Sequence, residues 1–187
     1  MTTSLPEKLV EIHRALAKRR VPHAFGGAIA LAYWTSDPRG TSDIDVNIFI
    51  PAERPERALR ALPEEIAQPD GLAELIAQDG QTRLWWGETP VDVFFDYHPL
   101  HEAAAEHRAT VPFAGTRIPI LGAVELAAFK AIFDRTRDWA DIEAMLAAGT
   151  LDLSQLRETL GRLVPKDDRR FAKLADAESL AALRQGG

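Results

Sequence analysis

The stretch that decides the fold is HAFGGAIALAYWTSDPRGTSDIDVNIFI, residues 23–50. Two glycines stand between short apolar runs, and a loop of hydroxyl and basic residues leads into a segment that alternates between apolar and polar side chains. Alternation with a period of two is typical of a strand with one buried face. The stretch therefore predicts a strand, a glycine turn, a short buried helix and a second strand, over residues 22–25, 26–27, 28–34 and 43–50.

Two carboxylates share the polar face of the second predicted strand. Asp43 and Asp45 are two residues apart, so their side chains point the same way, about 6 to 7 Å apart along the chain. Two like charges repel by about 4 kcal/mol at about 4 Å in an effective dielectric near 20, so a proton or a divalent cation is expected between them. The chain has no cysteine, and oxygen ligands alone favour Mg²⁺, which borrows further ligands from substrate phosphates.

A third carboxylate, Asp92, lies in the segment PVDVFFDY, residues 90–97, which predicts another apolar strand. The preceding segment QTRLWWG, residues 81–87, predicts its hairpin partner. Two interpretations stay open for Asp92, as a third metal ligand or as a polar residue that faces solvent from an edge strand. Asp96 is the competing acid, because it lies on the same face but near the polar end of the strand.

The glycine pair suits the binding of an anion. Gly26 and Gly27 stand between a predicted strand and a predicted helix, where backbone N–H groups and the helix N-terminus favour negative charge. A plain turn is the alternative, since glycines are common in turns. One helix and one loop return the chain from the glycines to Asp43 and Asp45, which favours a shared phosphate and metal site.

The rest of the sequence predicts strands in the middle of the chain and helices at its end. Helices are expected over residues 6–20, 53–62, 71–78, 99–108, 123–134, 138–148, 153–163 and from about 167, and two short strands are expected around residues 114–116. This order indicates an α/β fold, a mixed β-sheet flanked by helices and followed by a helical C-terminal part.

Composition limits the location and the partners of the protein. No apolar run of the 187 residues approaches the roughly 20 residues that span a bilayer, and the first residues lack the apolar core of a secretory signal. We therefore expect a cytoplasmic protein without membrane contact. The net charge of −6 argues against broad nonspecific nucleic-acid binding, although a local basic groove can still bind RNA.

Together the motifs GGAIALAYWTSDPRGTSDIDV and VDVFF resemble the DNA polymerase β-like nucleotidyltransferase superfamily. The resemblance implies that Gly26 and Gly27 contact nucleotide phosphates and that Asp43 and Asp45 bind magnesium ions. It also implies that Asp92 completes the second metal site and helps to activate the acceptor hydroxyl. The implied reaction is in-line attack on the α-phosphorus of a nucleoside triphosphate, with pyrophosphate leaving.

A later motif, ELAAFKAIFDRTRDWADIEAM, resembles AbiEii-type and MenT-type toxin nucleotidyltransferases, in which a helical lysine precedes an Arg-Asp-x-x-Asp segment. Lys130, Arg137, Asp138 and Asp141 occupy those positions. The resemblance implies that Lys130 contacts the triphosphate, that Arg137 belongs to the nucleotide site, and that Asp141 orients basic groups. The alternative is a set of ordinary surface pairs at i and i+4, such as Lys130 with Asp134, each worth only about 0.2 to 0.5 kcal/mol.

The loop before the acidic strand adds a hydroxyl to this resemblance. In GTSD, Thr41 stands two residues before Asp43, and Ser42 is a second hydroxyl; both are expected at the nucleotide site. Arg39 in the same loop is either a phosphate contact or a solvated turn residue. The resemblance covers roughly residues 21 to 145.

We therefore expect a magnesium-dependent nucleotidyltransferase that acts as the toxin of a toxin–antitoxin system. Residues 1–120 would form the nucleotidyltransferase core, and residues 121–187 would form a helical region that completes the active site. The resemblance implies a tRNA 3′ end as acceptor, a nucleoside triphosphate as donor and a cognate antitoxin as protein partner.

Two alternatives differ from this hypothesis in the acceptor or in the absence of catalysis. One is a transferase that modifies a small molecule such as an aminoglycoside, or a protein; the other is a non-catalytic nucleotide-binding protein of the same fold. An acidic pocket would favour a cationic antibiotic, whereas a basic strip would favour RNA. The residues expected in such a strip are Arg83, Arg135, Arg137, Lys166, Arg169, Arg170 and Lys173.

Overall fold

The computed structural model describes residues 3–38 and 40–185. These residues form two compact units, one of residues 3–29 and 40–121 and the other of residues 30–38 and 122–185. The division falls within helix α2 (Gly27–Thr35), which begins in the first unit and ends in the second. Among the described residues, no helix combines the length and the apolar character that crossing a membrane requires.

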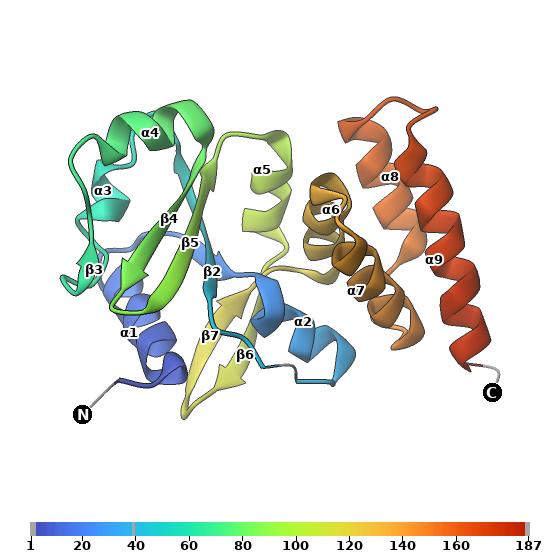
Figure 1. Ribbon diagram of the computed structural model, residues 1–187, viewed down its shortest axis with the longest axis horizontal. Coiled ribbons are helices and arrows are strands. Elements are labelled where there is room, and N and C mark those ends of the chain that lie inside the picture. Colours follow the sequence, from blue (N-terminus) through green and yellow to red (C-terminus); the bar gives the residue numbers. More distant parts are fainter. Residues whose placement is uncertain (1–2, 39, 186–187) are drawn as a thin grey trace. The chain divides into compact units, whose positions relative to one another are not determined.

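The first unit is built on a mixed seven-stranded sheet with the strand order β3-β4-β5-β2-β1-β7-β6 (Figure 1). The strands are β1 (His23–Phe25), β2 (Ile44–Pro51), β3 (Ile66–Ala67), β4 (Gln81–Trp86), β5 (Thr89–Asp96), β6 (Ala109–Phe113) and β7 (Thr116–Ile120). Strand β2 is parallel to β5 and antiparallel to β1, and β1 is parallel to β7. The predicted mixed sheet is therefore confirmed.

Strand β2 lies inside the sheet, between β5 and β1, and its apolar face is buried. Ile44, Val46 and Ile48 have no exposed surface, as the alternating pattern predicts. Asp45 lies between two of them on the opposite face and is half-buried. The strand ends at Pro51, whose ring removes a backbone donor from the sheet.

Four helices lie wholly within the described residues of the first unit, and three of them have contacts with the sheet. They are α1 (Leu5–Lys18), α3 (Glu56–Leu59), α4 (Leu72–Asp79) and α5 (Pro99–Glu106). In α1, Leu9, Ile12 and Leu16 recur at helical spacing and are completely buried, and the helix contacts β7. Helix α5 contacts β5 and β2, and α4 contacts β4.

The second unit consists of the C-terminal half of α2 and four further helices. These are α6 (Ala123–Phe133), α7 (Thr136–Ala147), α8 (Leu153–Leu163) and α9 (Arg169–Gln185). Helix α6 contacts α7 and α8, and α7 contacts α9. Leu126, Ile142, Leu160 and Leu174 supply the buried apolar contacts, one from each helix. The predicted helical C-terminal part is confirmed.

Two elements differ from the sequence prediction. The segment expected to be helical over residues 53–62 forms only the four-residue helix α3. The two-residue strand β3 was not predicted, because its existence depends on the pairing of Ile66 and Ala67 with Trp86 and Trp85 rather than on a local pattern.

Candidate active site

A row of charged residues crosses three neighbouring strands of the first unit. Asp45 of β2 is the register partner of Asp92 in the parallel strand β5, and Asp92 is in turn the partner of Arg83 in the antiparallel strand β4. Residues in register on adjacent strands point to the same side of a sheet, and the strands lie about 4.8 Å apart. The register therefore aligns an arginine and two aspartates side by side; we call these three residues the charged row.

The glycine turn lies directly beside the end of this row. The backbone N–H of Gly26 donates to the carbonyl of Asp45 at 3.0 Å. Gly27 has a φ of +52°, and a Cβ at this position would lie 1.8 Å from Asp45 Oδ2. Any side chain at position 27 would therefore strain the backbone and displace the carboxylate. The glycine is required because the Asp45 side chain packs against the first turn of α2.

Asp43 and Thr41 approach the row from the preceding loop. Asp43 stands one residue before β2, and Thr41 Oγ1 donates a 2.5 Å hydrogen bond to its carboxylate oxygen Oδ1. The backbone N–H of Asp43 donates to the same hydroxyl at 3.4 Å. Thr41 therefore orients the Asp43 carboxylate, whereas Ser42 is exposed. Arg39 lies outside the described residues.

Arg83 forms a bidentate ion pair with Asp92. Its Nε and Nη2 groups donate to the two carboxylate oxygens at 2.6 and 2.7 Å. The Arg83 side chain is 51% exposed and that of Asp92 is 18% exposed, so the pair lies at the surface of the sheet. The hydrogen bonds to Asp92, and the negative charges of Asp92, Asp43 and Asp45, raise the pKa of Arg83 above its ordinary value.

The acidic residues suit a divalent cation by chemistry and by register but not by the present orientation of their side chains. Asp92 faces Arg83 and Asp43 faces Thr41. Within residues 3–38 and 40–185, no three Asp, Glu, His or Cys side chains are arranged to hold a metal ion. The carboxylate oxygens of Asp92 are thus directed to Arg83, and that of Asp43 to Thr41, rather than to one shared point.

Asp96, the competing acid, is not part of the charged row. It lies four residues beyond Asp92 on β5 and has Pro51 as its register partner on β2. Burial and the nearby negative charge of Glu53 raise its pKa. The parallel register therefore brings Asp92, and not Asp96, beside Asp45.

The second unit contains a separate buried cluster made by α6 and α7. Lys130 Nζ lies 2.7 Å from Asp141 Oδ2 and 3.8 Å from Asp138 Oδ1. Lys130, Asp138 and Asp141 are 9%, 0% and 7% exposed. Asp138 also accepts from the side chain and the backbone N–H of Arg135, which closes the first turn of α7. Asp138 therefore has a structural role in addition to its contact with Lys130, and Arg137 beside it is exposed.

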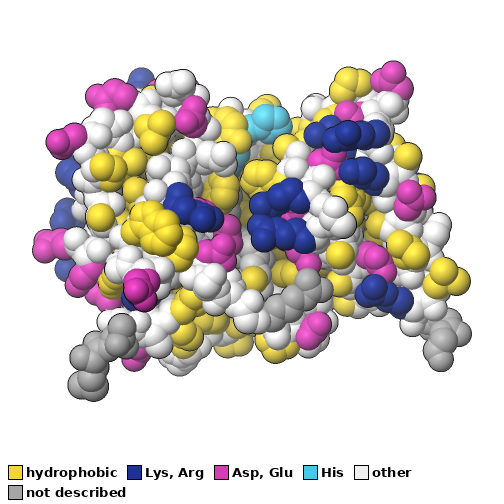
Figure 2. Space-filling view, in the orientation of Figure 1, with side chains coloured by type: hydrophobic (Ala, Val, Ile, Leu, Met, Phe, Trp, Pro, Cys, Tyr) yellow, Lys and Arg dark blue, Asp and Glu magenta, His cyan; other side chains and the backbone are white. Residues whose placement is uncertain are grey.

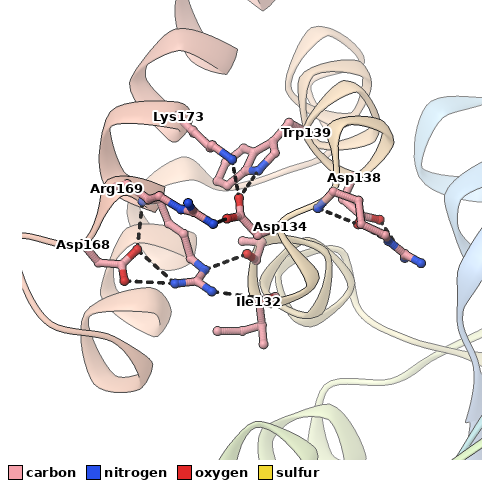
Figure 3. Close-up of polar contacts among 10 residues, drawn as sticks. Ile132, Asp134, Asp138, Trp139, Asp168, Arg169 and Lys173 are labelled. Atoms are coloured by element: carbon pink, nitrogen blue, oxygen red, sulfur yellow. Dashed lines mark hydrogen bonds and ion pairs between the residues drawn. The ribbon is translucent and has the colours of Figure 1, made fainter.

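Asp134 is the centre of a polar network that the sequence interpretation did not find (Figure 3). It ends α6 with a φ of +57°, and its carboxylate accepts from Trp139 Nε1 at 2.8 Å, from Lys173 Nζ at 2.6 Å, and from Arg169. These hydrogen bonds, that of Lys173 foremost, lower the pKa of Asp134. The alternative of a surface pair between Lys130 and Asp134 is not formed, because the left-handed turn directs Asp134 to α7 and α9.

The basic residues expected to form an RNA-binding strip are largely paired with acids. Arg83, Arg135 and Arg170 pair with Asp92, Asp138 and Asp168, and both Arg169 and Lys173 pair with Asp134. Figure 2 accordingly shows Lys and Arg side chains interspersed with Asp and Glu over the helices of the second unit. Such pairs leave less positive charge for a nucleic acid than the sequence predicts.

The mixed sheet, the glycine turn and the neighbouring acidic residues define a protein of the nucleotidyltransferase fold. The chain belongs to the family described as nucleotidyl transferase AbiEii toxin, type IV TA system, whose model matches residues 14–186. The protein is thus a nucleotidyltransferase of a toxin–antitoxin family, which confirms the family resemblance seen in the sequence motifs. No curated protein shows significant sequence similarity to it.

Solved structures agree with this assignment at the level of the fold. The antibiotic-resistance factor ANT(2'')-Ia superposes with a TM-score of 0.55 at 14% identity, over 100% of this chain and 95% of that chain. The complex of ANT(2'')-Ia with adenylyl-2''-tobramycin gives 0.52 at 14% identity, over 95% and 94%. An antigenic nucleotidyltransferase-like protein from Paracoccidioides brasiliensis gives 0.53 at 18% identity, over 90% and 91%.

Proposed function

We propose that the protein transfers a nucleotide from a nucleoside triphosphate to the 3′ hydroxyl of an RNA, a tRNA in particular, with Mg²⁺ as cofactor. The observation that carries this proposal is the register of Asp45 with Asp92 beside the Gly26–Gly27 turn. It joins oxygen ligands for a hard cation to backbone N–H groups at the start of a helix, which suit a triphosphate.

The residues of the first unit divide the reaction between them. The Gly26–Gly27 turn receives the phosphates, and Thr41 holds Asp43 through its 2.5 Å hydrogen bond, with Ser42 beside it at the nucleotide site. Asp43, Asp45 and Asp92 would hold Mg²⁺, which neutralises phosphate charge when bound. The acceptor oxygen attacks the α-phosphorus, the bond to the β-phosphate oxygen breaks, pyrophosphate leaves, and a carboxylate oxygen of Asp92 accepts the hydroxyl proton.

The family resemblance assigns Lys130 and Arg137 of the second unit to the nucleotide. Asp141 accepts from Lys130 at 2.7 Å and so acts as a positioning residue for its ammonium group. The side chains of Lys130 and Asp141 are only 11% and 10% exposed, so packing and the ion pair restrict their geometry.

An arginine-lined hollow in the first unit supports a polyanionic acceptor. Arg19, Arg57 and Arg60 line an open hollow of about 480 Å³. Arg57 Nη2 donates to the carbonyls of Arg19 and Arg20 at the end of α1. In the described part of the chain no carboxylate forms an ion pair with these three arginines, unlike Arg83 of the charged row. Uncompensated guanidinium groups attract RNA phosphates and repel a cationic aminoglycoside.

The second candidate is transfer to an aminoglycoside, supported by the shared fold of the tobramycin-modifying structure. The two candidates predict different labelled products from one experiment. Purified protein is incubated with each labelled nucleoside triphosphate and Mg²⁺, together with total tRNA, with aminoglycosides or with cell protein. Label in the tRNA alone supports the proposal, whereas label in an antibiotic or a protein supports the corresponding alternative.

Two isosteric variants make this experiment specific. Asp45→Asn removes a charge from the charged row, and Asp96→Asn removes one from the same face of the sheet but outside the row. The proposal requires that only Asp45→Asn abolishes transfer. Binding of nucleotide without transfer in the wild type would instead favour a non-catalytic protein.

An RNA-modifying toxin would act in the cytoplasm and be neutralised by a cognate antitoxin. Co-expression with the neighbouring gene tests whether its product is that antitoxin.

A further inference from the structure

The charged row has its own built-in cation. We propose that Arg83 is the resident counter-ion of the carboxylates and that it competes with the divalent metal ion for Asp92. The inference rests on the metal site of the proposed function. It adds that metal loading requires the Arg83–Asp92 pair to open, so that Arg83 sets how tightly the metal binds.

The geometry of the pair supports competition. Arg83 reaches both oxygens of Asp92, at 2.6 and 2.7 Å, and therefore fixes the plane of the carboxylate toward β4. Asp45, the register partner of Asp92, lies on the other side, on β2. A cation shared by Asp45 and Asp92 would need Asp92 to turn toward β2. Its positive charge would also repel a guanidinium group that remained in place.

Because the pair is exposed, separating Arg83 from Asp92 requires little free energy. The Arg83 side chain is 51% exposed, and exposed ion pairs contribute little to stability. On β4, the neighbours on the same face, Gln81 and Trp85, are also exposed, so Arg83 can turn into solvent without disturbing the buried core. The pair therefore balances charge without holding the sheet together.

A plain hairpin salt bridge is the competing explanation, and the surroundings of Arg83 argue against it. A hairpin pair needs one acid, whereas Arg83 is attracted by Asp92 and also by Asp43 and Asp45, which lie on or beside a third strand. Three neighbouring acids without a cation repel one another. Arg83 reduces this repulsion, as a divalent cation bound by the same carboxylates would.

Metal binding measured directly tests the inference. Mn²⁺ replaces Mg²⁺ as the probe, because the electron paramagnetic resonance signal of free Mn²⁺ reports the bound fraction without any catalytic turnover. We expect Arg83→Gln to bind Mn²⁺ about tenfold more tightly than the wild type. Arg83→Lys, which keeps the charge but loses the fork, should fall between them. Arg117→Gln removes an exposed arginine of β7 from the same unit and should leave the affinity within twofold.

Thermal unfolding gives a second readout. Without metal, Arg83→Gln should unfold at a lower temperature than the wild type, because the carboxylates repel one another, and Mn²⁺ should raise its unfolding temperature more than that of the wild type. Arg117→Gln should show the wild-type metal response. Circular dichroism at 25 °C confirms that each variant is folded before metal is added.

Failure of the inference and failure of the metal site give different results. Equal or weaker Mn²⁺ binding by Arg83→Gln, in a protein whose binding is abolished by Asp45→Asn, overturns the role of Arg83 and leaves the proposed function intact. If neither the wild type nor Arg83→Gln binds Mn²⁺, both the metal site and the inference are wrong. Tight binding that appears only in Arg83→Gln supports the inference in its strongest form.

Discussion

The two units hold their acidic side chains in opposite ways. In the first unit, Asp92 is paired at the surface with an arginine that is 51% exposed. In the second unit, the side chains of Lys130, Asp138 and Asp141 are 11%, 0% and 10% exposed. An acid in an exposed ion pair can exchange its partner for a ligand with little change in free energy. Removing one member of a buried pair leaves the other charge buried without that partner, which destabilises the fold.

The comparison separates chemistry from architecture. Under the proposed function, the acids of the first unit bind a cation and a substrate, whereas the acids of the second unit fix cationic groups on α6 and α7. Substitutions in the first unit should therefore change the reaction with little effect on folding. Equivalent substitutions in the second unit should change folding itself.

The largest expected effect is on activity, at Asp45. Asp45→Asn keeps the size of the side chain and removes its charge. Nucleotide transfer should fall by about 10⁴-fold, because the proposed Mg²⁺ site loses one of its carboxylate ligands. Single-turnover transfer of labelled nucleotide measures this loss. Its thermal unfolding should remain close to that of Asp96→Asn, and a parallel collapse of folding in Asp45→Asn would contradict the separation of the two roles.

The next largest effect is on stability, at Lys130. Lys130→Met leaves Asp141 and Asp138 buried without their ammonium partner, which should lower the free energy of unfolding by about 3 to 4 kcal/mol. Urea unfolding measures the change. The double variant Lys130→Met with Asp141→Asn should recover part of it, because one buried negative charge is removed together with the ammonium group. Equal loss in the single and double variants would mean that packing rather than charge dominates.

The sequence predicts the apolar framework of the molecule well because that framework is local. The period of two over residues 43–50 and the helical spacing of Leu9, Ile12 and Leu16 depend only on neighbouring residues. The short strand β3 and the shortened helix α3 depend on distant partners and were missed or overextended.

Part of the candidate site could also be predicted from the sequence. In the hairpin of β4 and β5, the tight turn at Gly87 and Glu88 fixes the register, and counting outward from it places Arg83 opposite Asp92. The interpretation of Arg83 as part of an RNA-binding strip missed this pairing. The register of Asp45 with Asp92 could not be counted, because a long crossover of α3, β3, α4 and β4 separates β2 from β5.

The helical motif was recognised for its residue types but not for its partners. Lys130 pairs with Asp141 across two helices, and not with Asp134, which was the alternative at i+4. Asp134 adopts a left-handed conformation at the end of α6 instead, and this turn has no signal such as a glycine.

Acid should weaken the first unit before the second, since all five histidines lie in the first unit. Burial lowers the pKa of His23 to about 4, with the positive charges of His13 and Arg108 as smaller contributions, and burial also lowers that of His101 to about 4. A histidine with a folded pKa below its unfolded pKa of about 6.5 stabilises the protein above pH 6.5, and the stability is lost as the pH falls toward 4. The loss is about 3 kcal/mol per histidine at pH 4.

Hydrogen exchange at pH 7 and pH 4.5 measures this prediction unit by unit. Protection should fall in β1 and in the strands paired with it, and His23→Gln should reduce the pH dependence there. Replacement of exposed His107 by glutamine is the matched control. If α6 to α9 lost protection at a higher pH than β1, the prediction that acid weakens the first unit first would be wrong. The lowered pKa of Asp134 predicts that the network around it keeps its charge until lower pH.

The smallest effects lie within the second unit and sharpen the role of burial. Lys173 and Arg157 are similarly exposed, at 38% and 46%, but the acid that pairs with Lys173 is Asp134, which is 6% exposed, and the acid that pairs with Arg157 is Glu178, which is 49% exposed. Lys173→Met should therefore cost about 1 to 2 kcal/mol of unfolding free energy, and Arg157→Met less than about 0.5 kcal/mol.

Salt separates the two cases further, because exposed pairs are screened and buried acids are not. Raising the salt concentration to 0.5 M should remove the small effect of Arg157→Met and leave most of the effect of Lys173→Met in urea unfolding. If both costs disappeared together, the hydrogen bonds that Asp134 accepts from Trp139 and Arg169 would be sufficient to hold α6 and α7 against α9. The contrast between surface and buried charge would then apply to the Lys130 cluster but not to Asp134.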